Sequence, residues 1–99
     1  MPVTEGARVP TANGARYVAQ LCKHWSHKLE VAQNGDSARI VLLNDAVVTL
    51  VAQPETLDVG IEAASPEDLE LAKDVVVRHL DRFAFREAPL AYGWRDGEA

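Results

Sequence analysis

The stretch LEVAQNGDSARIVLLNDAVVTLVAQPETLDVGIEA, residues 29–63, decides the fold of this chain. Its last part, residues 56–63, alternates apolar residues with polar or small ones, as a strand with one buried face does. Three turn signals divide the stretch: Asn34-Gly35-Asp36, Asn44-Asp45 and Gln53-Pro54-Glu55. Strands joined by such short turns pair antiparallel with their neighbours. The sequence therefore predicts an antiparallel meander of at least four strands.

One helix is predicted before this meander in the sequence, and a second one after it. The first covers about residues 12–26, with Thr11 or Asn13 as its N-cap. Its apolar positions recur at i, i+3, i+4 and i+7, which gives one buried stripe: Val18, Leu21, Cys22 and Trp25. The second covers about residues 66–84, because Ser65 can cap it and Pro66 suits the first helical position.

The predicted fold class is α+β, with both helices packed on one face of the sheet and running roughly antiparallel. The 99 residues suffice for one domain, and we expect an ordered core at about residues 7–95. Residues 1–6 and 96–99 are polar or small, so we expect them to be loose. An edge strand within Gly6–Pro10 and a last short strand at Leu90–Arg95 complete the expected sheet.

Composition excludes several functional classes. Fifteen acidic and ten basic residues give a net charge of −5, which disfavours a nucleic-acid partner. No apolar run approaches the roughly 18 residues of a membrane span. The N-terminal residues lack the pattern of a signal peptide, and a single cysteine cannot form an internal disulfide. We therefore expect a cytoplasmic protein with no membrane contact.

The stretch LCKHWSHK, residues 21–28, is the first candidate site. Its basic residues are candidate ligands of a small anion: Lys23, His24, His27 and Lys28. His24 and His27 stand at i and i+3, so they can share a helix face and are a candidate metal pair. Cys22 points to the apolar stripe instead, where a small core residue is the commoner role and a nucleophile the rarer one.

A structural interpretation competes with this one. A helix C-terminus carries partial negative charge, and basic residues there complement it without binding anything. The second helix repeats this plan, with His79 and Arg82 as further ligand candidates near its end. His79 lies at the edge of the apolar stripe, so it needs a hydrogen-bond partner. Antiparallel helices would leave His79 roughly 20 Å from the end where His24 and His27 lie, which disfavours one site of three histidines.

Two blocks carry a family resemblance: RVPTANGARYVAQLCKHWSHKLEV, residues 8–31, and HLDRFAFRE, residues 79–87. They resemble the signature blocks of a bacterial family called domain of unknown function 2218. The family has no established activity. Its members are similar to domains sometimes joined to siderophore-interacting flavin reductases, which implies a link with iron uptake.

Three functions remain open at this point. The first is a non-catalytic binding module for a small anionic ligand or a ferric chelate, and we favour it. The second is an enzyme that uses His24 or His79 as general acid or base, but no nucleophile or cofactor motif accompanies them. The third is an interaction domain that forms a homodimer through a sheet edge. The sequence assigns no cofactor.

Overall fold

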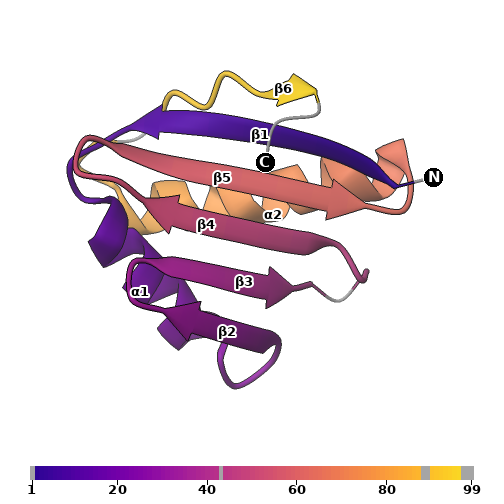
Figure 1. The fold of residues 1–99 in the computed structure, drawn as a ribbon, viewed down its shortest axis with the longest axis horizontal. Helices are drawn as coiled ribbons and strands as arrows, with labels where there is room; N and C mark the ends of the chain where they lie inside the picture. Colours follow the sequence, from indigo (N-terminus) through magenta and orange to yellow (C-terminus); the bar gives the residue numbers. More distant parts are fainter. Residues whose placement is uncertain (1, 43, 88–89, 97–99) are drawn as a thin grey trace.

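The computed structural model describes residues 2–42, 44–87 and 90–96, which fold into one sheet and two helices (Figure 1). The elements follow one another in this order: β1 (Val3–Pro10), α1 (Gly14–Trp25), β2 (Glu30–Asn34), β3 (Ser37–Val41), β4 (Val47–Ala52), β5 (Thr56–Ala63), α2 (Pro66–Phe83) and β6 (Arg95–Asp96). Every strand pair is antiparallel, so the predicted α+β class is confirmed.

The predicted meander is present as β2-β3-β4-β5, and two further strands extend it. The full order is β2-β3-β4-β5-β1-β6, so β1 is an interior strand and not the expected edge strand. Val3 pairs with Ala63 and Pro10 with Thr56, so the expectation that residues 1–6 are loose is wrong for Val3 onward. The partner of β1 is β5, which lies more than 40 residues later in the sequence. Such distant pairing leaves no local signal, so the sequence predicts β1 too short.

Turn residues fix the register of the meander. Gly35 lies between β2 and β3 with φ of 60°, a conformation that glycine adopts without steric cost. Asp45 lies between β3 and β4 with φ of 65°, and short polar residues tolerate this region better than most. The sequence predicts a strand over Ala38–Leu43, and β3 corresponds to it but ends at Val41; Leu43 lies outside the described residues.

Both helices have the predicted positions within two residues. At the start of α2, Ser65 Oγ accepts a hydrogen bond of 3.2 Å from the Asp68 amide, which confirms the expected cap. Asn13 is the N-cap of α1 but makes no side-chain cap, and Thr11 Oγ1 instead accepts from the Asn13 amide at 3.1 Å. Among the described residues, no helix is long and apolar enough to cross a membrane.

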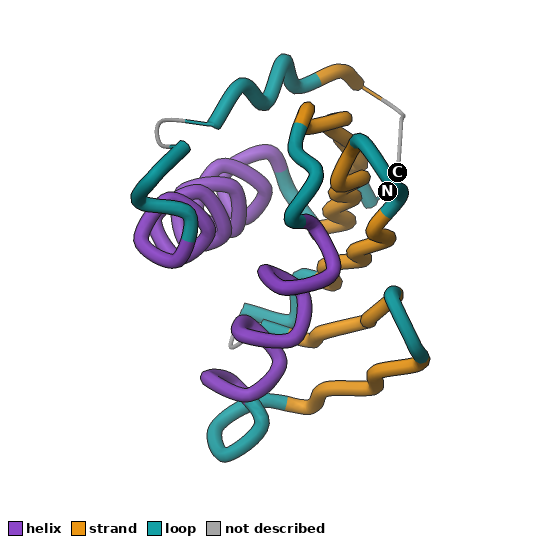
Figure 2. Tube along the Cα trace, turned by 90° about the vertical axis from the view of Figure 1, so that its left-hand side faces the viewer, coloured by secondary structure: helices purple, strands orange, loops and turns teal. Residues whose placement is uncertain are grey.

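Both helices cover the same face of the sheet, as predicted (Figure 2). They do not run antiparallel, however. The axis of α2 lies along β5, whereas α1 runs across the strands toward β2 (Figures 1 and 2). The strand order explains this difference. The 12 residues of α1 rise about 18 Å, close to the four strand spacings that separate β1 from β2. The 18 residues of α2 rise about 27 Å, close to the length of β5.

The core lies between this face and the helices. Eleven large side chains are fully buried there: Val9, Val18, Leu21, Ile40, Val48, Leu50, Leu57, Val59, Ile61, Val76 and Leu80. Gly14 allows α1 to start close to the sheet, because a Cβ there would stand 3.3 Å from both the Ala52 and Leu57 Cβ atoms. In the part of the chain that the structure describes, no helix lies on the outer face of the sheet (Figure 2).

The C-terminal strap, residues 90–95, runs beside α2 and ends on β1. Only its last residue is in a strand, so the expected strand over Leu90–Arg95 is wrong for most of its length. Hydrogen bonds to a side chain, and not a backbone ladder, hold most of the strap in place. Asp81 on α2 accepts from the Leu90 amide at 3.2 Å and from the Tyr92 hydroxyl at 3.0 Å. Of the expected loose end 96–99, Asp96 pairs with Glu5, and residues 97–99 lie outside the described part.

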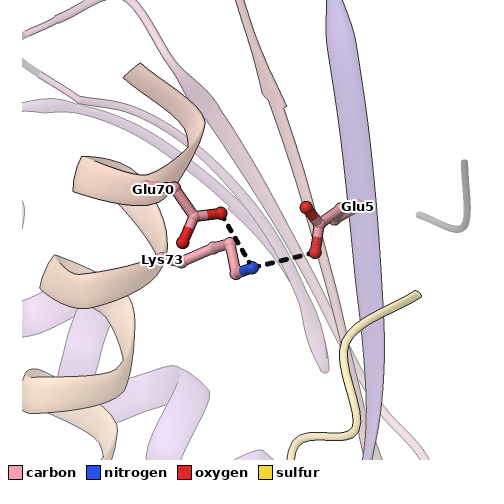
Figure 3. A network of polar contacts seen from close by, with 3 residues as sticks. All are labelled: Glu5, Glu70 and Lys73. Atoms are coloured by element: carbon pink, nitrogen blue, oxygen red, sulfur yellow. Dashed lines mark hydrogen bonds and ion pairs between the residues drawn. The ribbon is translucent and has the colours of Figure 1, made fainter. Parts of the chain in front are cut away.

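An ion pair ties α2 to β1 beneath the strap (Figure 3). Lys73 Nζ donates to Glu5 Oε1 at 2.9 Å and to Glu70 Oε2 at 3.0 Å, and it lies 5.3 Å from the ring centre of Trp94. Burial alone would lower the pKa of Lys73, but the two carboxylates outweigh it and the pKa is raised. The lysine therefore stays charged in a largely buried position.

Candidate functional site

The two family-like blocks meet at the crossing of the helices. His24 and Trp25 come from the last turn of α1, and His79 and Phe83 come from the C-terminal half of α2. The His24 ring lies 5.2 Å from the His79 ring and 5.8 Å from the Phe83 ring, centre to centre. The Trp25 ring lies 5.0 Å from that of His79. We call these four residues the ring cluster.

The contact of His24 with His79 corrects the distance argument from the sequence. That argument placed the end of α1 near the start of α2, as antiparallel helices would. Because α1 instead crosses α2, its end reaches the residues around His79. Two of the three histidines are therefore neighbours, although they are far apart in the sequence.

The orientation of His79 follows from a hydrogen bond within α2. Its Nδ1 lies 2.7 Å from the carbonyl oxygen of Val75, one turn earlier. A carbonyl oxygen only accepts, so Nδ1 carries the proton and donates it. The expected partner for this partly buried histidine is thus confirmed, and Nε2 remains as the second nitrogen of the ring.

An apolar groove of about 240 Å³ adjoins the ring cluster. We call it the α1–α2 groove. It lies between the end of α1, the first half of α2 and the β3–β4 connection, and these residues line it: Trp25, Lys28, Leu29, Leu42, Asn44, Leu71, Ala72 and Val75. Lys28 is the one charged residue among them. Leu71 is 60% exposed, so it adds open apolar surface to the wall of the groove.

The predicted ligand residues divide into three groups around this groove. Lys28 lines it, and His24 and His79 belong to the ring cluster beside it. Lys23 and His27 are exposed at the end of α1, and Arg82 is exposed on α2. Sequence reasoning missed Leu71. The available signal was a large apolar residue that lies outside the apolar stripe of the second helix and is therefore expected to be exposed.

Cys22 is buried, as predicted, with 3% of its surface exposed. Burial also raises the pKa of its thiol, which opposes formation of the thiolate. These observations favour the core role over the nucleophile.

A carboxylate from the second block joins α1 to the segment after α2. Glu87 accepts hydrogen bonds from the side chains of Thr11, Asn13 and Tyr17, and the Thr11 hydroxyl is 2.9 Å from both carboxylate oxygens. The hydrogen bond from Tyr17 is the largest cause that lowers the pKa of Glu87. The pKa of Tyr17 is raised, mainly by burial and next by its hydrogen bond to Glu87. The arrangement fixes where α1 begins.

A second, more polar cleft of about 670 Å³ lies between β1 and the C-terminal strap. Arg8 and Asp58 lie on its wall and bond each other at 3.3 Å, and Tyr92 contributes from the strap. None of the candidate ligand residues lines this cleft. In the described part of the chain, no group of three or more His, Cys, Asp or Glu residues is placed to hold a metal ion.

Comparison with known proteins gives the family. A family model described as an uncharacterized protein conserved in bacteria (DUF2218) matches residues 6–95. The chain belongs to this family. The chain is also similar to the NMR structure of PA4090 from Pseudomonas aeruginosa, to which it is 31% identical and on which it superposes with a TM-score of 0.80. The match covers 98% of this chain and 99% of that chain. No curated protein matches. Family membership thus confirms the resemblance of the two blocks, and the function has to be argued from the site.

Proposed function

We propose that the chain is a non-catalytic binding module whose ligand occupies the α1–α2 groove. The observation that carries the proposal is the lining of this groove: apolar side chains with a single lysine. Small-molecule sites are typically apolar surfaces with a few polar groups that fix the orientation of the ligand. Leu71 supplies exposed apolar area, the mostly buried Trp25 forms part of the wall, and Lys28 supplies a cation for an acidic group.

The dimensions and charge of the groove select a class of ligand. At about 240 Å³ it is smaller than sites for drug-sized molecules, so it suits one or two rings. Covering the exposed side chain of Leu71 would remove apolar surface from water and favour binding. The best fit is therefore a small aromatic anion. A ferric chelate belongs to this class when its chelating groups are aromatic and acidic, and iron handling rests on the family resemblance alone.

The experiment uses 2-naphthoate as the probe and neutral 2-naphthamide as its charge control, with EDTA present. The fluorescence of Trp25 in a Trp94→Phe variant reports occupancy. Lys28→Met should weaken 2-naphthoate about three- to fivefold, the value of one exposed charge, and leave 2-naphthamide unchanged. Leu71→Ser should weaken both probes, because it removes apolar contact without changing charge.

Lys23→Met is the matched control, since Lys23 is an exposed lysine of α1 that does not line the groove. It should leave both affinities unchanged. Equal losses in Lys23→Met and Lys28→Met, or no binding of either probe, would contradict the proposal. A parallel titration with 2,3-dihydroxybenzoate, alone and with Fe³⁺ but without EDTA, tests the iron-chelate version separately.

Catalysis is the second candidate, and one observation favours it. The rings of His24 and His79 are close enough for one to act on a substrate held by the other. Cys22 does not supply a nucleophile to this pair, because it is buried in the core. We therefore place catalysis behind binding.

A further inference from the structure

We propose that His24 and His79 form a site for a borderline divalent cation, such as Cu²⁺ or Zn²⁺. The site differs from the pair suggested by the sequence, His24 with His27, because it joins two helices. It goes beyond the proposed function, since it needs no occupant in the α1–α2 groove.

The separation of the two rings matches what a shared metal ion requires. A metal bound at 2.0–2.1 Å from an imidazole nitrogen lies about 3.2 Å from the ring centre. Two imidazoles at a tetrahedral angle around one ion then have their centres about 5 Å apart. The observed separation is 5.2 Å, with the ring planes inclined by 48°. The His24 side chain is exposed, so its ring is free of the packing that would prevent it from turning a nitrogen toward the ion.

The hydrogen bond of His79 supports the same conclusion. Histidines that bind metals usually donate their other ring nitrogen to a carbonyl or carboxylate, which fixes the tautomer and the orientation of the ring. Here Nδ1 donates to the Val75 carbonyl at 2.7 Å and leaves Nε2 as the ligand atom. His24 is exposed on the neighbouring helix and gives the second nitrogen.

The surroundings determine what else the ion would carry. Two imidazoles leave positions open on a four-coordinate ion, and both ligands are neutral. Basic residues stand near the two histidines in the sequence: Lys23 on α1, Lys28 just after α1, and Arg82 on α2. They weaken binding of a bare cation and favour an ion that also holds anionic ligands. Imidazole pairs prefer Cu²⁺ over Zn²⁺ and do not select Mg²⁺.

The test is a titration of untagged full-length protein with Cu²⁺, Zn²⁺ and Mg²⁺, in the absence of any organic ligand. Cu²⁺ should quench the fluorescence of Trp25, because the Trp25 ring lies 5.0 Å from that of His79. In the Trp94→Phe variant, where Trp25 is the remaining tryptophan, this quenching should saturate at one ion per chain. Zn²⁺ should raise the melting temperature, because it binds only the folded arrangement of the two helices. Affinity should fall on acidification, since protons compete for the ring nitrogens.

Variants decide between the histidine pairs. His24→Ala and His79→Ala should each lower the Cu²⁺ affinity about tenfold or more, as losses at metal sites do. His27→Ala and Cys22→Ala should leave it unchanged. The proposal would be overturned if Cu²⁺ did not bind stoichiometrically or if His79→Ala kept the wild-type Cu²⁺ affinity. It would also be overturned if His27→Ala or Cys22→Ala lowered that affinity. None of these outcomes depends on 2-naphthoate, so the failure of the metal site and of the groove can be distinguished.

Discussion

At the scale of single residues, the molecule uses a few polar side chains to fix positions that apolar packing leaves free. His79 contacts two rings of α1 while its Nδ1 is held by Val75. Glu87 collects hydrogen bonds from three residues at the start of α1. Both histidine and carboxylate come from the second family-like block, HLDRFAFRE. The block therefore explains how α1 is placed on α2.

We expect Glu87→Gln to lower the free energy of unfolding by about 1 kcal/mol at pH 7, because an amide accepts less well than a carboxylate. The pKa of Glu87 is lowered in the folded protein, so its contribution is present above the ordinary value of 4.5 and is lost as the pH falls through the folded-state value. Denaturant titrations at pH 7 and pH 3 should therefore show the difference between variant and wild type shrinking in acid.

Glu62→Gln is the control for this measurement, since Glu62 is an exposed glutamate of β5. It should change the stability little at either pH. A stability difference for Glu87→Gln that is equal at pH 7 and pH 3 would refute a role for the ionised carboxylate.

At the scale of elements, local signals were enough for some features and not for others. The alternation in residues 56–63 and the Ser65 cap predicted β5 and the start of α2 correctly. The direction of α1 had no such signal, because it depends on β1 pairing with β5 and not with β2. The meeting of His24 with His79 depends on that direction, so it could not be predicted either. The basic residues of LCKHWSHK could be identified, but not which of them borders a groove.

The tie between Lys73 and Glu5 is the strongest candidate for a polar contribution between elements. Their side chains are only 16% and 14% exposed. Lys73→Met should cost about 1–3 kcal/mol, because it leaves the Glu5 carboxylate without its partner. The double variant Lys73→Met/Glu5→Leu should be more stable than this single variant, since no unpaired charge remains. The raised pKa of Lys73 means that its contribution persists below the ordinary value of 10.5 and is lost only at higher pH.

The exposed pair of Arg78 with Asp74 provides the comparison on the same helix, with side chains 66% and 63% exposed. Arg78→Met should cost no more than about 0.5 kcal/mol. Thermal or denaturant unfolding of the four proteins measures both effects. A cost for Lys73→Met as small as that for Arg78→Met would show that the Lys73–Glu5 pair contributes little.

At the scale of the whole molecule, the sheet is unequally protected. β5 lies between β4 and β1 and beneath α2. By contrast, β2 forms an edge, and among the described residues just the two of β6 pair with the other side of β1. Amide hydrogen exchange should therefore be slowest in β5 and its neighbours and fastest in β2. Exchange measured by NMR, residue by residue, checks this order. Protection of β2 equal to that of β5 would indicate that another chain covers the edge, as in the homodimer considered from the sequence.

The position of β1 between β5 and β6 also has a consequence for synthesis on the ribosome. β1 emerges first, yet its partners emerge last: Val3 pairs with Ala63, and Gly6 with Arg95. The meander can form hairpin by hairpin as it emerges, but β1 has to wait for β5 before it gains a ladder. Until then its apolar residues have no sheet to cover them, and the nascent chain is exposed to mispairing during that interval. The first strand to be made is thus among the last to be secured.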